Sequence, residues 1–197
     1  ETGHLRSALT VSSRSRGQWG ELHLRRIVEM AGMLNHVDFD EQQQAGDQRP
    51  DMIVRLPNQA ILPVDAKTSL EHYLQAAAAT DETARRQFLK AHAAALRGHV
   101  TALGRKEYWK QFEKAPEVVV MYVPNEACLG AAFDEDPALI EDGLRQNVLL
   151  ATPVSLYGLL KAVAFGWQQQ ELATNARRIA EEGQMLCDRL NKFLGHL

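Results

Sequence analysis

Apolar residues near the start of the chain recur at the spacing of a helix. Leu24, Ile27 and Ala31 fall on one face, and Gly32 follows at the place where a helix-ending glycine is expected. The polar residues between them fall on the opposite face. This pattern predicts a helix over residues 17–31 with one buried side.

Short strand-like runs come next. Residues 52–56 and 60–64 are apolar runs separated by Pro57-Asn58-Gln59, a combination that predicts a β-hairpin. A polar strand-like stretch at residues 36–43 precedes them, so three strands are expected after the first helix. Residues 117–123 form a nearly continuous apolar run, which is typical of a buried strand.

The remaining segments are mostly helical in pattern. Residues 69–114 are rich in alanine and lack proline, which predicts two or more helices with a break near Thr80-Asp81, where aspartate can cap a new start. A short strand is expected at residues 147–151. Helices over residues 154–165 and 167–194 then close the chain.

The last predicted helix carries a stripe of Leu172, Ile179, Leu186 and Leu190. Such a stripe packs either on the core of its own domain or on a second copy of the chain. We expect core packing, and a homo-oligomer is the alternative.

Composition places these elements in one domain. The chain has 197 residues, 45% of them hydrophobic, and is expected to bury a single core over residues 4–197, because Glu1-Thr2-Gly3 shows no structural logic. No apolar run reaches the roughly 18 residues of a membrane span, so no membrane contact is expected. Cys128 and Cys187 lack any framework spacing, which favours free thiols in the reducing cytoplasm.

The hairpin places two acids face to face. If its turn centres on Asn58, Asp51 lies directly opposite Asp65, with Cβ atoms about 4.5–5.5 Å apart. Two bare carboxylates this close repel unless a cation lies between them. Lys67 emerges on the same face as Asp65 and is placed to orient or deprotonate a metal-bound water. Oxygen ligands favour Mg²⁺ or Mn²⁺ as the cofactor. Alternatively, these aspartates simply end strands.

A third acid, Glu21, lies three residues before Leu24 on the stripe of the first helix. A carboxylate on a core-facing stripe is costly unless it is paired or bound to metal, so Glu21 is a further candidate metal ligand. The alternative is an ordinary first-turn acid that the helix dipole stabilises.

Positive charge is concentrated in the helical segment 69–114. Residues 85–114 hold eight basic and two acidic residues, a net charge of +6, whereas the rest of the chain carries −9. This asymmetry is expected where a protein faces phosphates, although a charge run is more often a solvated helix face. DNA is therefore the expected partner.

One stripe of that segment combines polar and apolar residues and predicts a helix that lines a polar cleft. The candidate DNA contacts are Arg49, His92, Arg97, His99, Lys106 and Tyr108, with Gln43 as a possible second-layer residue of the metal site. The alternatives are satisfied core histidines and a Tyr108 that packs rather than stacks on a base.

The element order predicts an α/β fold with a mixed central sheet flanked by helices, helical insertions and a long C-terminal helix. It resembles a PD-(D/E)xK restriction-endonuclease-like core. That core places an acid on its first helix, Pro-Asp on its second strand and D/E-x-K on its third. Glu21 matches the first position, Asp51 the second, and Asp65 with Lys67 the third.

The chain also resembles the RmuC family, bacterial proteins with a nuclease-like domain that are associated with DNA recombination. The similar stretches are Arg16-Gly17-Gln18-Trp19-Gly20-Glu21, Arg49-Pro50-Asp51, Val64 to Leu70, His92 to Arg97, His99 to Trp109, Met121 to Glu126, Ala151-Thr152-Pro153 and Trp167 to Gln170. The resemblance implies a PD-(D/E)xK-like fold, DNA as partner and dependence on a divalent metal. Family members often carry an N-terminal membrane anchor and a long coiled coil, and neither is seen in this sequence.

These observations predict a metal-dependent deoxyribonuclease that hydrolyses phosphodiester bonds. In this hypothesis Asp51 and Asp65 hold Mg²⁺, Glu21 binds a second ion or its water, and Lys67 positions the attacking water. Two alternatives remain open: a DNA-binding or scaffolding module without turnover, and a protein-interaction head on a coiled coil.

Overall fold

The structure, a computed structural model, describes residues 13–39, 50–66 and 70–194 of the chain. Its elements follow in the order α2 (Ser13–Ala31), η1 (Leu34–His36), β1 (Val37–Phe39), β2 (Met52–Arg55), η2 (Pro57–Gln59), β3 (Ile61–Ala66), α3 (Glu71–Ala78), α4 (Glu82–Lys106), η3 (Tyr108–Gln111), β4 (Val119–Tyr122), α5 (Glu126–Glu135), α6 (Leu139–Arg145), β5 (Val148–Ala151) and α7 (Pro153–Leu194). The expected α/β class is confirmed.

One mixed sheet of five described strands organises the body, in the order β1-β2-β3-β4-β5. The pairs β1–β2 and β2–β3 are antiparallel, whereas the pairs β3–β4 and β4–β5 are parallel. The parallel crossover from β3 to β4 is made by α3 and α4, and α5 and α6 connect β4 to β5.

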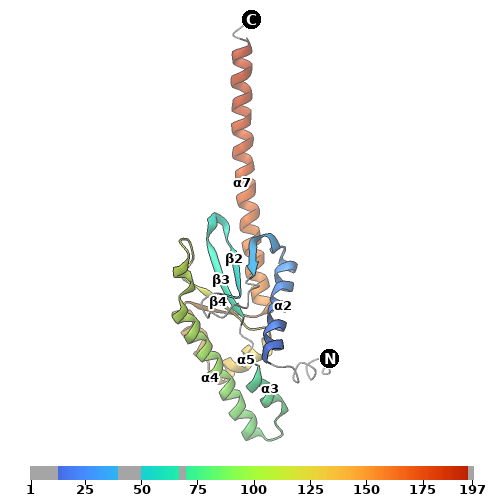
Figure 1. The fold of residues 1–197 in the computed structure, drawn as a ribbon, viewed down its shortest axis with the longest axis vertical. Coiled ribbons are helices and arrows are strands. Elements are labelled where there is room, and N and C mark those ends of the chain that lie inside the picture. Colours follow the sequence, from blue (N-terminus) through green and yellow to red (C-terminus); the bar gives the residue numbers. More distant parts are fainter. Residues whose placement is uncertain (1–12, 40–49, 67–69, 195–197) are drawn as a thin grey trace.

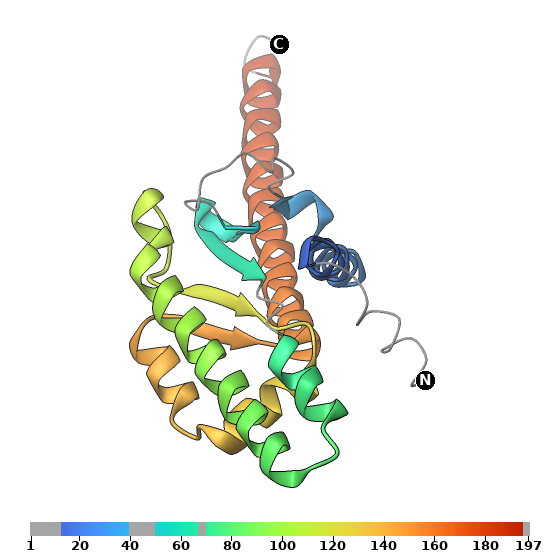
Figure 2. The same cartoon turned by 60° about the horizontal axis from the view of Figure 1, so that its bottom comes forward.

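Helices cover both faces of this sheet (Figures 1 and 2). On one face, Val64, Val120 and Tyr122 pack with Leu24 of α2 and Leu156 of α7 in one apolar core. On the other face a second core sits under α4 and α5, and its buried members include Leu96, Leu103, Val119, Met121 and Leu129. We call these the α2/α7 face and the α4 face.

Local signals in the sequence set several element boundaries. Gly32 adopts φ +76° directly after α2, the left-handed conformation that a helix-ending glycine provides. The side chain of Asp81 accepts a hydrogen bond from the Ala84 N–H at 2.8 Å, so it caps α4 at the predicted break. Of the strand expected at residues 36–43, β1 is present, and the rest lies outside the described residues.

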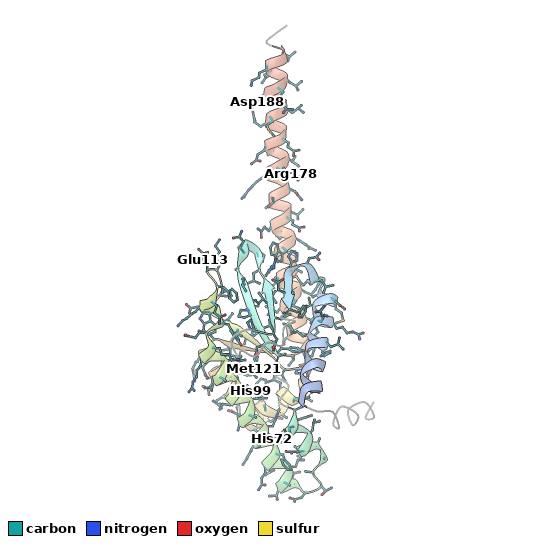
Figure 3. All side chains as sticks on the ribbon, in the orientation of Figure 1. His72, His99, Glu113, Met121, Arg178 and Asp188 are labelled. Atoms are coloured by element: carbon teal, nitrogen blue, oxygen red, sulfur yellow. The ribbon has the colours of Figure 1, made fainter. Side chains whose placement is uncertain are left out.

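The C-terminal helix differs from its prediction in two ways. It is one continuous helix of 42 residues, because Gly166 sits within it against the ring of Pro57 instead of ending a helix. Its second half projects away from the body (Figures 1 and 3). Every side chain described from Glu171 to Leu194 is exposed, so the expectation that this stripe packs on the core is wrong.

Candidate functional site

The hairpin brings Asp51 and Asp65 together in the predicted register. Met52 pairs with Val64 and Arg55 with Ile61, and Asp51, the residue before β2, continues this pairing to a position opposite Asp65. The backbone N–H of Ala66 donates a hydrogen bond of 2.6 Å to Asp51 Oδ2. This bond anchors the Asp51 carboxylate to the end of β3.

Asp65 points to the α4 face of the sheet. It pairs in parallel with Met121, whereas its neighbours Val64 and Ala66 pair with Val120 and Tyr122 of the α2/α7 face. Only 2% of Asp65 is exposed. A carboxylate so deep in a sheet is unusual, and it marks this strand end as a candidate site.

Two further polar residues lie at the end of α4 and the start of η3, which contacts β3. Glu107 adopts a left-handed conformation (φ 43°, ψ 45°), which turns the chain sharply into η3. There the fully buried Tyr108 accepts a hydrogen bond of 3.1 Å from Lys106 Nζ. Burial raises the pKa of Tyr108, the bond from Lys106 opposes that rise, and the carboxylates of Asp65 and Asp51 raise it further.

Tyr108 therefore belongs beside the aspartates and is not an exposed platform for a base. Of the two roles predicted for Tyr108, stacking on a base or packing, the structure shows packing, and the charges of both carboxylates act on its hydroxyl. Lys106 lies next to that hydroxyl instead of on an open phosphate-binding surface. Tyr108 comes two residues after the last residue of α4, and nothing in the sequence there indicates that it packs beside β3.

The donor set suits a hard divalent cation, because carboxylate oxygens are the ligands that Mg²⁺ and Mn²⁺ prefer. Among the described residues no three His, Cys, Asp or Glu side chains come together as a possible metal site. The Glu21 side chain and the residues Gln43, Arg49 and Lys67 lie outside the described part of the chain. The two aspartates are thus the described portion of the predicted site.

His92 lies in the core and not in a cleft. It is 1% exposed, its Nε2–H donates to the Cys128 carbonyl oxygen at 2.8 Å, and its ring lies 5.7 Å from that of Tyr73. His92 is therefore a core histidine, as the alternative interpretation had it, and it does not lie on an open phosphate-binding surface. His99, two turns later, is partly exposed.

Arg97 holds α4 against the next two helices. Its guanidinium donates to both oxygens of Asp136, at 2.6 and 2.7 Å, and to Asp142 at 2.5 Å. These hydrogen bonds lower the pKa of both carboxylates and raise that of Arg97. These bonds to two acids make Arg97 a structural clamp, and its contact with DNA stays a prediction.

Other charges of the +6 segment are also partly neutralised. Arg85 and Arg86 pair with Glu82, at 2.8 and 3.4 Å, and Lys110 pairs with Glu107 at 2.7 Å. These are exposed pairs within the same helical segment and contribute little to stability. The surface of this segment is therefore less positive than a count of its basic residues suggests.

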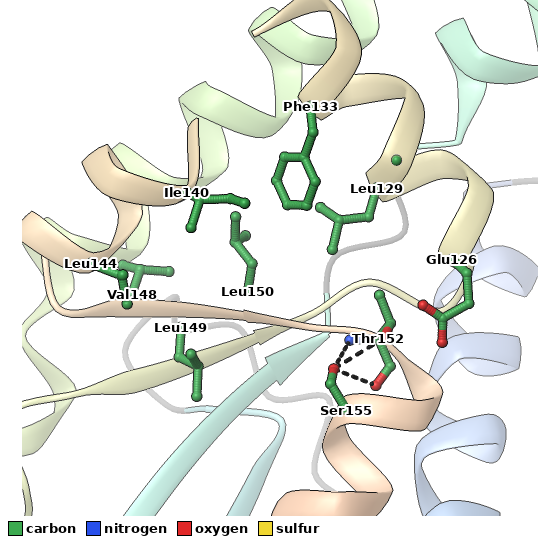
Figure 4. A pocket seen from close by; sticks show the side chains of 11 residues that line it. Glu126, Leu129, Phe133, Ile140, Leu144, Val148, Leu149, Leu150, Thr152 and Ser155 are labelled. Atoms are coloured by element: carbon green, nitrogen blue, oxygen red, sulfur yellow. Dashed lines mark hydrogen bonds between the residues drawn. The ribbon is translucent and has the colours of Figure 1, made fainter. Parts of the chain in front are cut away.

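A separate hollow of about 410 Å³ lies between β5 and the helices α5 and α6 (Figure 4). Its lining is mostly apolar and includes Leu129, Phe133, Ile140, Leu144, Leu149 and Leu150. At its edge the Ser155 hydroxyl bonds to the N–H and the side chain of Thr152, which fixes the start of α7. The hollow lacks the paired acids and is not a candidate for hydrolytic chemistry.

Comparisons with known proteins identify the family. The whole chain, residues 1–197, matches the RmuC family. The DNA recombination protein RmuC homolog of Zymomonas mobilis subsp. mobilis is 41% identical over 201 residues, covering 100% of this chain and 45% of that protein. The homolog of Pseudomonas aeruginosa is 35% identical over 93% of this chain and 42% of its own length. DNA recombination protein RmuC of Escherichia coli K12 is 31% identical, and the match covers 98% of this chain and 42% of that protein.

The chain thus spans less than half the length of these relatives. No solved structure matches it. Within its described part, no helix is long and apolar enough to cross a bilayer. The match over the full length, together with relatives that are more than 30% identical, shows that the chain belongs to the RmuC family.

Proposed function

We propose that this domain has a PD-(D/E)xK fold and is the catalytic part of a metal-dependent DNA nuclease that acts in DNA recombination. The observation that carries the proposal is the register of the hairpin, which sets Asp51 opposite the buried Asp65 at the start of Asp65-Ala66-Lys67. The names of the relatives support DNA recombination as the process.

The chain's own residues divide the work of phosphodiester hydrolysis. The carboxylates of Asp51 and Asp65 would hold one divalent cation, and the Ala66 N–H keeps the Asp51 carboxylate in place. Such an ion, when bound, lowers the pKa of its water and neutralises charge on the scissile phosphate. Lys67 would hold the attacking water, and Glu21 would bind a second ion or its water.

Tyr108 and Lys106 extend the site on the α4 face. Burial and both aspartates raise the pKa of Tyr108, and Lys106 lowers it. A tyrosine is ordinarily protonated at neutral pH, so its hydroxyl would be able to donate to a phosphate oxygen. The ammonium of Lys106 stands beside it and supplies positive charge near the developing negative charge. DNA would be held further out by His99 and the exposed basic residues Lys90, Arg105 and Lys114, and Arg49, outside the described residues, stays a candidate contact.

Labelled single-stranded, duplex, hairpin and branched DNA, incubated with the chain and Mg²⁺, Mn²⁺ or EDTA, tests the proposal. We expect cleavage with either metal and none with EDTA. Asp65→Asn and Lys67→Ala should each lower the cleavage rate by about 100-fold or more. Asp38→Asn is the matched control, because Asp38 is an exposed acid that pairs with Arg55 at 2.6 Å on β2.

Two results would contradict the nuclease proposal. One is the absence of cleavage of every DNA structure with both metals. The other is equal loss of activity in Asp38→Asn and Asp65→Asn. Salt-sensitive DNA binding without cleavage would instead support a non-catalytic DNA-binding module, whereas negligible DNA binding at low salt would leave a protein-interaction head.

A further inference from the structure

The second half of α7 carries an apolar stripe that nothing in the described chain covers. Leu172, Ile179, Leu186 and Leu190 are each more than half exposed. Together with Ala176 and Gly183 they recur at alternating steps of four and three residues, the heptad spacing of a coiled coil. A lone helix of this kind gains little stability from its own hydrogen bonds in water, so the stripe favours a partner helix.

The body ends where this stripe begins. Trp167 stacks on His36 at 4.3 Å, and its Nε1–H donates to the Arg55 carbonyl oxygen at 2.9 Å. The side chains described from Glu171 to Leu194 are all exposed, and Figure 3 shows Arg178 and Asp188 projecting from this free rod. The rod is therefore open to a partner along its whole length.

We propose that two copies of this chain pair through residues 175–194 of α7 as an antiparallel coiled coil. In the symmetric antiparallel alignment, Ile179 meets the partner's Leu190 and Gly183 meets the partner's Leu186. Gly183 then faces a large residue instead of its own copy, which is how facing layers fill space. A parallel pair would instead set Gly183 against its own copy and Ala176 against its own copy, leaving voids in two layers.

Charge agrees with the same alignment. Glu182 and Arg189 occupy positions that flank the apolar seam, and in the antiparallel pair Glu182 lies beside the partner's Arg189 on both sides of the symmetry axis. A parallel pair would bring Glu182 next to the partner's Cys187 and Arg189 next to the partner's Leu194. It would therefore gain no ion pair from either charge.

The two bodies also fit this arrangement. The partner's Leu194, where α7 ends, would lie beside Asn175, about 12 Å along the axis from Trp167 at 1.5 Å per residue. The described part of the partner helix therefore lies clear of the body. The two Trp167 residues would stand about 50 Å apart along the axis, so the paired aspartates of the two copies would be at opposite ends of the assembly.

Mass measurement by light scattering or sedimentation equilibrium on the 197-residue chain tests the pairing. We expect a dimer whose population rises with concentration. Ile179→Asp should shift it to single copies, because it buries a charge in the seam. Met185→Asp is the matched control, since Met185 is 52% exposed and off the stripe, and it should leave the dimer intact. Circular dichroism and the melting of the body show that each variant is folded.

A charge exchange tests the orientation. Glu182→Arg alone and Arg189→Glu alone should each weaken the dimer, and the double variant should restore it. Independence of dimerisation from these charges would contradict the antiparallel alignment, because only that alignment brings the two positions together.

Disulfide trapping gives a second test of orientation. In a Cys187→Ala background, Ile179→Cys and Leu190→Cys should not cross-link to themselves, because their copies are about 16 Å apart along the axis. A mixture of the two variants should cross-link. The remaining Cys128 is buried, and burial raises its pKa to about 12, so it does not compete. Self-cross-linking of either variant, or single copies at every concentration, would overturn the proposal.

Discussion

The two faces of the central sheet are built from the same strands but have different roles. On the α2/α7 face, Val64 and Val120 are fully buried among apolar neighbours. On the α4 face, one residue further along β3, Asp65 is almost as deeply buried next to Met121. Neighbouring residues of β3 are thus equally buried but point to opposite faces. The apolar side chain stabilises the fold, and the carboxylate forms part of the candidate site.

Polar groups on the α2/α7 face are paired within the face itself. The Tyr122 hydroxyl and His23 Nδ1 share a hydrogen bond of 2.8 Å in which either atom can be the donor, and a neutral imidazole allows the hydroxyl to donate. Burial, followed by the charge of Arg26, lowers the pKa of His23 and so favours that form. Tyr122 serves packing, whereas Tyr108 on the opposite face stands among charges. Changes to the two faces should therefore separate stability from activity.

The largest effect is expected from placing a carboxylate on the apolar side. Val64→Asp should destabilise the fold by more than about 4 kcal/mol, because it buries an unpaired charge. Urea unfolding followed by circular dichroism measures this, with Leu22→Asp on the exposed side of α2 as control. If Val64→Asp were as stable as Leu22→Asp, the α2/α7 face would not be the closed core described above.

The next effect concerns activity rather than stability. Tyr108→Phe removes the hydroxyl that lies near Asp51 and Asp65, and it should lower the rate of DNA cleavage about tenfold, or about 1.4 kcal/mol of transition-state stabilisation. The matching change on the other face, Tyr122→Phe, should leave that rate unchanged. Equal cleavage rates for Tyr108→Phe and Tyr122→Phe would show that Tyr108 has no part in the site.

Tyr122→Phe should instead cost about 1 kcal/mol of stability through the lost bond to His23. Burial, and then the Glu126 carboxylate, raise the pKa of Tyr122. The folded state thus holds the phenol proton more tightly than the unfolded chain, so stability falls as pH rises above the ordinary value of about 10. Tm measured between neutral and alkaline pH should fall less steeply for Tyr122→Phe than for the unmodified chain.

The smallest effect concerns the outer wall of the α4 face. Arg97→Ala should lower the Tm by about 2 °C, a modest change because the Arg97 side chain is 37% exposed and screened. Its hydrogen bonds lower the pKa of Asp136 and Asp142, so this contribution is present at neutral pH and is lost as pH falls below about 4. A scan of Tm against pH should show this acid loss in the unmodified chain and less of it in Arg97→Ala. Arg85→Ala, which breaks a surface pair, is the control.

Sequence periodicity predicted local features well because they depend on neighbours in the chain. The register that opposes Asp51 and Asp65 follows from the turn at Asn58, and the start of α4 follows from the cap at Asp81. The buried faces of α2 and β4 follow from their apolar patterns.

Features that depend on distant partners were predicted poorly. The burial of His92 requires the carbonyl of Cys128, which lies 36 residues away, and the clamp of Arg97 requires acids 39 and 45 residues away. Tyr108 reaches the aspartates only because the backbone reverses at Glu107. The exposed stripe of α7 shows the same limit, since a pattern identifies an apolar face but not what covers it.

Binding of Mn²⁺ to the isolated domain, followed by calorimetry or by the electron paramagnetic resonance of free Mn²⁺, tests the central claim most directly. We predict saturable binding that Asp65→Asn and Asp51→Asn each weaken by at least about tenfold, or about 1.4 kcal/mol, while Asp38→Asn leaves it unchanged. Equal binding by all four proteins, or no binding by the unmodified chain, would contradict the account.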